Sequence, residues 1–192
     1  MAQAVYSVNI VGYINLQLAP GFSLIANQLN ASPNNKISTL LPAPPEGTAV
    51  FKFNKITGAF ASMNFSDGVW DNDLLSLAPG EGVFISIDGS FAPTGYTLTL
   101  VGEVQKAGGS TAITAGYQVV SSVIPQAGTL TALEFVPAEG DSVFKFNPVN
   151  GAFLPSSYSD GAWDNEPSFA IGESFFLSAA PGHAAWVRSP LP

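Results

Sequence analysis

The chain contains the stretch Val50-Phe51-Lys52-Phe53-Asn54 and repeats it as Val143-Phe144-Lys145-Phe146-Asn147. The same offset of 93 residues separates Gly58-Ala59-Phe60 from Gly151-Ala152-Phe153. It also separates Ser66-Asp67-Gly68-Val69-Trp70-Asp71-Asn72 from Ser159-Asp160-Gly161-Ala162-Trp163-Asp164-Asn165. A long block that recurs at a constant offset indicates two copies of one supersecondary unit.

Both copies have the sequence pattern of β-strands. The 19 glycines and 15 prolines leave little room for helices, and short alternating segments lie between them. The clearest of these segments runs from Tyr96 to Val104. We therefore predict an all-β fold of two tandem repeats of a small sandwich-like or barrel-like unit, related by internal pseudo-symmetry. The first repeat is expected at residues 1–96 and the second at residues 97–192.

The aromatic residues of the repeated block are expected to form the core. Alternation along a strand places both phenylalanines of Phe-Lys-Phe on one face and the lysine on the other. The residues expected to be buried are Phe51, Phe53, Trp70, Phe84, Phe144, Phe146, Trp163 and Phe175. Trp186 has no counterpart in the first copy, so we expect it on the surface, where an indole ring can stack on a glycan.

The composition limits the partners of the protein. Charged residues make up 10% of the chain, against about a quarter in an average soluble domain. The net charge is −8, and six cations provide no basic stripe for nucleic acid. No apolar run approaches the roughly 18 residues that a membrane-spanning helix needs. A weakly charged surface favours self-association, because few like charges keep neighbouring molecules apart.

A resemblance adds an expectation about location. Three segments of the first copy form a pattern: Gly21-Phe22-Ser23-Leu24-Ile25-Ala26-Asn27, the Trp70-Asp71 hairpin and Pro79-Gly80-Glu81-Gly82-Val83-Phe84-Ile85. This pattern resembles a β-module of exported bacterial proteins of verrucomicrobial and planctomycete type. The second copy departs from this pattern at Ile171-Gly172-Glu173-Ser174. The resemblance implies a β fold and export to the outside or the surface of the cell, and it carries no assigned activity. The N-terminus, Met1-Ala2-Gln3-Ala4-Val5, fits either a native start in the cytoplasm or a site from which a signal peptide has been removed. We favour removal, because low charge and richness in Gly, Ser, Thr, Asn and aromatic residues are typical of exported β proteins.

No group of residues has the pattern of a catalytic centre. His183 is the only histidine and cysteine is absent, so a Ser-His-Asp triad would depend on this one residue. Its surroundings, Pro181-Gly182-His183-Ala184, are typical of a turn, and we expect a solvated turn histidine. We therefore predict a non-enzymatic protein without a cofactor.

Acidic residues cluster at equivalent places in the two copies. They are Asp67, Asp71 and Asp73 in the first and Asp160, Asp164 and Glu166 in the second. Carboxylate oxygens are ligands that Ca²⁺ prefers, but the spacing is not that of an EF-hand loop. The alternative is turn chemistry, in which Asp-Gly opens a tight turn and Asp-Asn ends one. We favour the turn interpretation and keep calcium as the weaker hypothesis.

The N-terminal strand, Val5 to Leu18, is expected to mediate assembly. Its Val11-Gly12 pair matches Val101-Gly102, yet no strand precedes it in the chain. We expect it to pair with the chain's own C-terminal strand or with an edge of a neighbouring molecule. The contact residues would be Val8, Ile10, Gly12, Ile14, Leu16 and Leu18.

The function predicted from the sequence is that of an extracellular structural protein. It would self-assemble through β-strand edges into a filament, a sheet or a surface layer, with itself as the main partner. The alternatives are a carbohydrate-binding or adhesive module, which would bind surface glycans, and an accessory domain of an exported enzyme.

Overall fold

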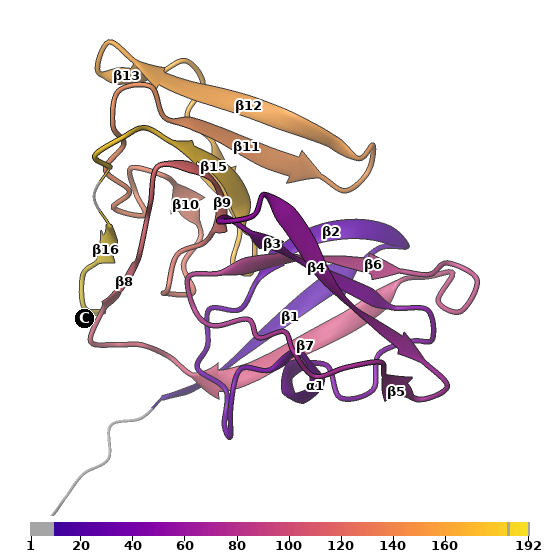
Figure 1. The fold of residues 1–192 in the computed structure, drawn as a ribbon. Coiled ribbons are helices and arrows are strands. Elements are labelled where there is room, and N and C mark those ends of the chain that lie inside the picture. Colours follow the sequence, from indigo (N-terminus) through magenta and orange to yellow (C-terminus); the bar gives the residue numbers. More distant parts are fainter. Residues whose placement is uncertain (1–9, 184, 192) are drawn as a thin grey trace, which may run out of the picture.

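The computed structural model describes residues 10–183 and 185–191, and nearly all the regular structure in them is β-strand (Figure 1). The first part of the chain forms β1 (Val11–Leu18), β2 (Gly21–Ala26), α1 (Ile37–Leu40), β3 (Ala49–Asn54), β4 (Ala59–Ser66), β5 (Val69–Trp70), β6 (Gly82–Ile87) and β7 (Tyr96–Glu103). The second part forms β8 (Gly109–Thr111), β9 (Gly116–Val120), β10 (Gly128–Thr129), β11 (Ser142–Asn147), β12 (Ala152–Ser159), β13 (Ala162–Trp163), β14 (Ser168–Phe169), β15 (Phe175–Ala179) and β16 (Trp186–Arg188). The predicted all-β class is confirmed. No helix in the described part of the chain has the length and apolar character needed to cross a bilayer.

Each repeat is built around a five-stranded antiparallel sheet. The strand order is β2-β6-β3-β4-β5 in the first sheet and β9-β15-β11-β12-β13 in the second, so the two sheets match strand for strand. Two-stranded ladders, β1 with β7 and β8 with β16, accompany the sheets, and β10 with β14 forms a further ladder in the second repeat. The duplication seen in the sequence is therefore present in the topology.

The turn between β4 and β5 shows why the repeated Asp-Gly pair is needed. Asp67 has φ 53° and Gly68 has φ 77°, the left-handed conformation that a tight hairpin turn requires. The Glu46 carboxylate accepts hydrogen bonds of 2.8 Å from both of their backbone N–H groups. Glu139 does the same for the equivalent turn of the second repeat, at 2.9 and 2.8 Å. This geometry fits the turn interpretation of the Asp-Gly sequence.

Each sheet buries one face in a core of its own, and that face is not the one expected. Val50, Met63 and Ile85 are fully buried in the first core. Because side chains alternate, Phe51 and Phe53 lie on the face opposite Val50. Within the set expected to be buried, only Phe175 is fully so. The others are half-buried, namely Phe51, Phe53, Trp70, Phe84, Phe144, Phe146 and Trp163.

The strand β7 belongs to the first repeat. Leu98 and Leu100 are each 1% exposed and lie in the same core cluster as Val50. The second core cluster begins at Ile113. The expected boundary after residue 96 is therefore too early, because β7 closes the first core and the change of core falls between Val104 and Ile113.

The two sheets are joined by a reciprocal exchange at their edges. The N–H of Ala26, at the end of β2, donates to the Gly172 carbonyl at 2.8 Å, and the N–H of Ser121, after β9, donates to the Gly80 carbonyl at 2.9 Å. The turn before β15 thus covers the edge of β2, and the turn before β6 covers the edge of β9. The buried Gln28 side chain strengthens this junction, accepting from the N–H of Gly172 at 2.8 Å.

Candidate functional site

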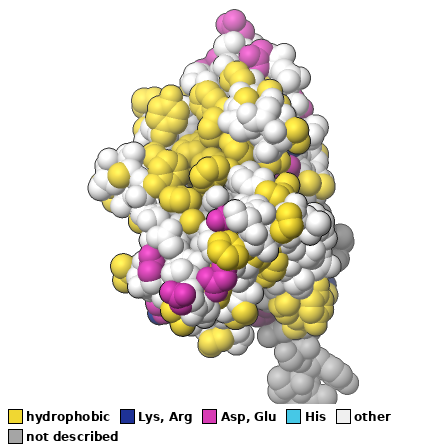
Figure 2. Space-filling model, turned by 90° about the vertical axis from the view of Figure 1, so that its right-hand side faces the viewer, with side chains coloured by type: hydrophobic (Ala, Val, Ile, Leu, Met, Phe, Trp, Pro, Cys, Tyr) yellow, Lys and Arg dark blue, Asp and Glu magenta, His cyan; other side chains and the backbone are white. Residues whose placement is uncertain are grey.

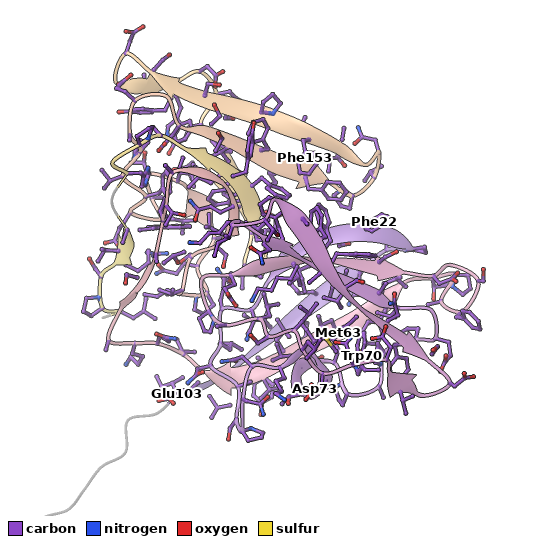
Figure 3. The ribbon with its side chains drawn as sticks, viewed as in Figure 1. Phe22, Met63, Trp70, Asp73, Glu103 and Phe153 are labelled. Atoms are coloured by element: carbon purple, nitrogen blue, oxygen red, sulfur yellow. The ribbon has the colours of Figure 1, made fainter. Side chains whose placement is uncertain are left out.

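The most prominent surface feature is a field of aromatic rings between the two five-stranded sheets. We call it the aromatic face, and its members are Phe22, Phe51, Phe53, Phe60 and Phe84 from the first sheet and Tyr117, Phe144, Phe146, Phe153 and Phe176 from the second. The sheets diverge toward the right of Figure 1, and Phe22 and Phe153 lie on opposite sides of this opening in Figure 3. Seen from that side, the molecule shows a continuous hydrophobic area (Figure 2).

The rings of the aromatic face follow a pseudo-twofold arrangement. The ring centroids of Phe84 and Phe146 lie 5.1 Å apart, and those of the equivalent residues Phe176 and Phe53 lie 5.3 Å apart. Phe84 and Phe176 correspond to each other and meet at 6.2 Å, so the pseudo-axis passes between them. Most neighbouring rings meet edge-on or tilted, which is a favourable geometry for aromatic pairs.

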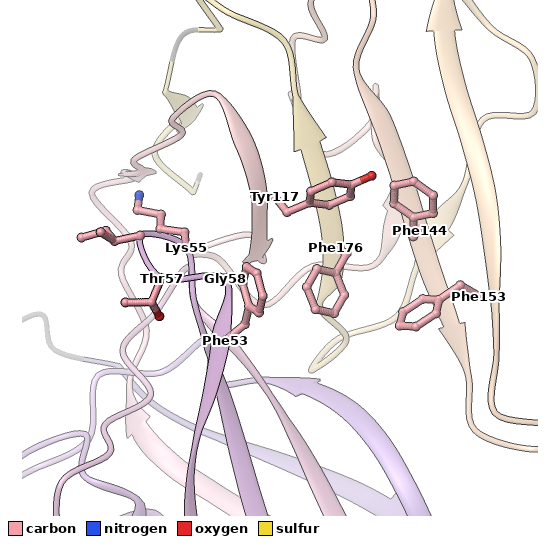
Figure 4. Close-up of a pocket in the computed structure, with 9 residues that line it drawn as sticks. Phe53, Lys55, Thr57, Gly58, Tyr117, Phe144, Phe153 and Phe176 are labelled. Atoms are coloured by element: carbon pink, nitrogen blue, oxygen red, sulfur yellow. The ribbon is translucent and has the colours of Figure 1, made fainter.

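Two grooves flank this axis, and their linings correspond. The first has a volume of about 730 Å³ and includes Phe53, Tyr117, Phe144, Phe153 and Phe176 in its lining (Figure 4). The second has a volume of about 410 Å³ and is lined by Phe22, Phe51, Phe60, Phe84, Phe146, Pro148 and Gly151. Polar side chains in the linings are limited to Lys55, Thr57 and Tyr117, all in the first groove.

Four rings of this face remain substantially open to solvent. Their exposed fractions are 50% for Phe22, 48% for Phe60, 57% for Tyr117 and 41% for Phe153. At about 200 Å² for a whole aromatic side chain, these four rings offer about 400 Å² of surface. The largest apolar patch on a monomer commonly measures about 300 to 600 Å² and is often functional, so the aromatic face is the candidate site. The sequence placed only the phenylalanines of the two Phe-Lys-Phe segments on one strand face, and that face was expected to be buried.

The tryptophans contribute to the cores. Trp70 is half-buried against the first core, and its Nε1–H donates to the Leu41 carbonyl at 2.9 Å. Trp186 is 2% exposed, and its Nε1–H donates to the Leu133 carbonyl at 2.7 Å. The expectation of a surface Trp186 that stacks on a glycan is therefore wrong, because the indole fills the second core.

The side chain of His183 is buried, which corrects the expectation of a solvated histidine. Its exposed fraction is 1%, and its Nδ1 lies 2.7 Å from Oδ2 of the buried Asp141. The ring packs against Phe135 at 5.2 Å between centroids. The Asp141 carboxylate also accepts the backbone N–H groups of Ala138 and Ala180, both at 2.8 Å. This arrangement ties the turn around His183 to the second core.

The acidic residues considered for calcium each have their own hydrogen-bond partners. Asp71 accepts the backbone and side-chain N–H groups of Asn64 at 3.0 and 2.9 Å. The side-chain hydrogen bond is the main reason that the pKa of Asp71 lies below its usual value. Across residues 10–183 and 185–191, no three acidic or histidine side chains come together as a metal site.

The remaining acids are likewise held apart by local contacts. Asp73 pairs with Lys36 and Ser38, and Asp164 accepts the N–H of Ser157 at 2.9 Å. Glu166 accepts the N–H of Thr131 at 2.6 Å. The calcium candidates also include Asp67 and Asp160, whose backbone N–H groups donate to Glu46 and Glu139. In neither copy do the candidate carboxylates come together around one point.

The N-terminal strand pairs within its own repeat. Residues Val11–Leu18 of β1 face Tyr96–Glu103 of β7 along their whole length, with Gly12 directly opposite Gly102. The two Val-Gly segments noticed in the sequence are therefore partners of each other. The expectation that β1 pairs with the C-terminal strand is wrong, because β16 pairs with β8.

The residues proposed for assembly accordingly have mixed environments. Ile14 and Leu18 are buried in the first core, Leu16 packs against it, and Ile10 is 45% exposed. A Cβ on Gly12 would lie 2.9 Å from a methyl group of Val104 and 3.0 Å from one of Leu29, so a larger residue there would displace these side chains. Val8 lies outside the described residues.

Comparison with protein-family models, with curated proteins and with solved structures finds no match to this chain, so its functional assignment depends on the site geometry.

Proposed function

We propose that the protein is a non-enzymatic, extracellular structural protein that works by contact, burying its aromatic face against another protein surface. The observation that supports this proposal is the group of four rings that are 41 to 57% exposed within one continuous apolar area. Burial of apolar area is favourable by about 25 cal/mol per Å², so covering about 400 Å² provides a substantial driving force. Low charge across the chain adds little electrostatic opposition to such a contact.

A protein surface fits this face better than a carbohydrate does. A sugar site combines aromatic platforms with several polar groups that bind hydroxyls. The second groove has no polar side chain in its lining, and the first has only Lys55, Thr57 and Tyr117. The indole of Trp186, the ring considered for glycans, is buried. These features favour the structural role over the carbohydrate-binding alternative.

The open apolar face can be tested by retention on a phenyl-substituted matrix. The variant Phe22→Ser/Phe153→Ser removes two open rings, one from each sheet, and we expect it to elute earlier than the wild type. Leu74 is 84% exposed and is not part of the aromatic face, so Leu74→Ser is the control for loss of an exposed apolar side chain elsewhere, and it should elute closer to the wild type than the double variant does. If the double variant is retained as strongly as the wild type, the aromatic face is not the contact surface.

A further inference from the structure

The strand β4 has an open edge beside the aromatic face. β4 pairs with β3 along one side, from Ala59 to Asn64. On its other side, β5 pairs only with Phe65 and Ser66. The part of β4 from Ala59 to Asn64 therefore has an outer edge that β5 does not cover.

The hydrogen bonds around Asn64 show which backbone groups point outward. The N–H of Asn64 donates to Asp71 Oδ1 at 3.0 Å, and its carbonyl accepts the N–H of Asp71 at 2.9 Å, so both groups face away from β3. Backbone groups alternate in direction along an antiparallel strand, so those of Ser62 and Phe60 face outward as well. The Ser62 carbonyl accepts the Asn72 side chain at 3.3 Å. No described residue hydrogen-bonds to the other outward groups, the N–H of Ser62 and the N–H and carbonyl of Phe60.

The second repeat carries a proline at the position equivalent to Ser62. Pro155 lies in β12, 93 residues after Ser62. The backbone N–H and carbonyl of Ser157 bond to Asp164 and so point away from β11. Because backbone groups alternate in direction, the backbone of Pro155, two residues earlier, also points away from β11. A proline there sacrifices no bond to β11 and gives this edge no N–H to offer. Proline is one of the devices by which proteins protect a sheet edge from pairing. The edge of β12 is thus blocked, and the edge of β4 is not.

We propose that the open edge of β4 binds the same edge of a second copy of this chain, antiparallel and about a twofold axis. In a register centred on Ala61, the N–H of Phe60 in each copy meets the Ser62 carbonyl of the other, where it replaces the long 3.3 Å bond from the Asn72 side chain, and the N–H of Ser62 meets the Phe60 carbonyl. Every open backbone group on both edges then has a partner, and the two sheets become one continuous sheet. This inference rests on the proposed contact function and names the partner.

Three features favour a second copy over a different strand. The edge is self-complementary in the register centred on Ala61, where a small side chain faces itself. The segment Ala59–Ser66 contains no charged residue, so two copies meet there without like-charge contact despite a net charge of −8. Phe60 is 48% exposed, and pairing through β4 brings the aromatic faces of the two copies together.

The test compares full-length variants by sedimentation velocity over a wide concentration range. We expect a concentration-dependent dimer for the wild type and for Ser62→Ala, which keeps the backbone N–H. Ser62→Pro removes one N–H per copy and places a ring against the facing strand, so dimerisation should weaken by roughly a hundredfold or more. The melting temperature of Ser62→Pro should stay close to that of the wild type, because β12 already accepts proline at this position.

A gain-of-function variant makes the test independent of any folding defect in Ser62→Pro. Pro155→Ser restores an N–H to β12, so each copy has two open edges and should form assemblies longer than dimers. A wild type that stays monomeric, or a Ser62→Pro variant that dimerises as well as Ser62→Ala, would overturn the edge proposal. Retention on the phenyl matrix would still decide the contact function of the aromatic face, so the two failures are distinguishable.

Discussion

Replacing Gln28 by alanine should destabilise the whole chain, because this side chain holds the two repeats together. Gln28 is 2% exposed. Its Nε2 donates to the Ile124 carbonyl at 3.2 Å, and its Oε1 accepts from the N–H of Gly172 at 2.8 Å. Gln28→Ala leaves two buried backbone groups without partners, and each such group costs about 1 to 3 kcal/mol. We expect the free energy of unfolding to fall by about 3 kcal/mol.

Differential scanning calorimetry measures this loss directly. For a chain of this length, a loss of about 3 kcal/mol lowers the melting temperature by about 6 to 12 °C. Gln17→Ala is the matched control, because Gln17 is exposed on β1 and its Oε1 accepts only from the Thr97 hydroxyl, at 2.8 Å. Its effect should stay within about 0.5 kcal/mol.

The wild type should unfold in a single transition, because the edge of each sheet is completed by the other repeat. Two separate transitions would refute the inference that the repeats form one cooperative body. The same conclusion would follow if Gln28→Ala melted within a degree or two of Gln17→Ala, since the junction would then contribute little to stability.

Three further outcomes follow from the structure. Trp186→Ala should lower the free energy of unfolding in urea titrations by about 3 to 5 kcal/mol, since it empties a buried site and leaves the Leu133 carbonyl unpaired; a loss below about 1 kcal/mol would contradict this burial. The hydrogen bond from the Asn64 side chain is the main cause that lowers the pKa of Asp71 in the folded protein. The ionised carboxylate should therefore contribute its full stabilisation at pH values above the pKa of Asp in the unfolded chain, about 3.9. That contribution should be lost as the pH falls through the lower pKa of the folded state. Asp71→Asn should therefore be less stable than the wild type at pH 7 and should approach it in acid, as followed by urea titrations at each pH; a constant difference would exclude this link. Thermal melts in EDTA and in excess Ca²⁺ should coincide, and a calcium-dependent rise of several degrees would revive the calcium hypothesis.

The sequence predicted the duplication and the strands well, but not which face of each strand is buried. Alternation correctly grouped Phe51 with Phe53. It could not decide between their face and that of Val50, because both faces carry apolar residues and periodicity alone does not rank them. The partner of β1 was missed for a related reason. The two Val-Gly strands were recognised as alike, and their similarity was taken as repetition when they in fact pair, with Gly12 opposite Gly102.

Residues present in one copy only were the other source of error. Trp186 and His183 have no counterparts in the first repeat. Trp186 was expected at the surface for that reason, and His183 because its surroundings are typical of a turn. The structure buries both side chains beside Phe135, where the second core has diverged from the first. A missing counterpart thus reports divergence between copies and carries no information about exposure. The sequence identified Phe51, Phe53, Phe144 and Phe146 as equivalent residues but assigned them to the core, because their openness depends on how the two sheets diverge.

The reciprocal edge exchange has a consequence for the order of events during synthesis. The edge of β2 ends at Ala26, and the carbonyl that completes it belongs to Gly172, far later in the chain. At about 5 to 20 residues per second, the ribosome needs roughly 7 to 30 seconds to make the intervening segment. Throughout that interval the nascent first repeat presents an unfinished strand edge, to which a strand of another nascent chain can pair.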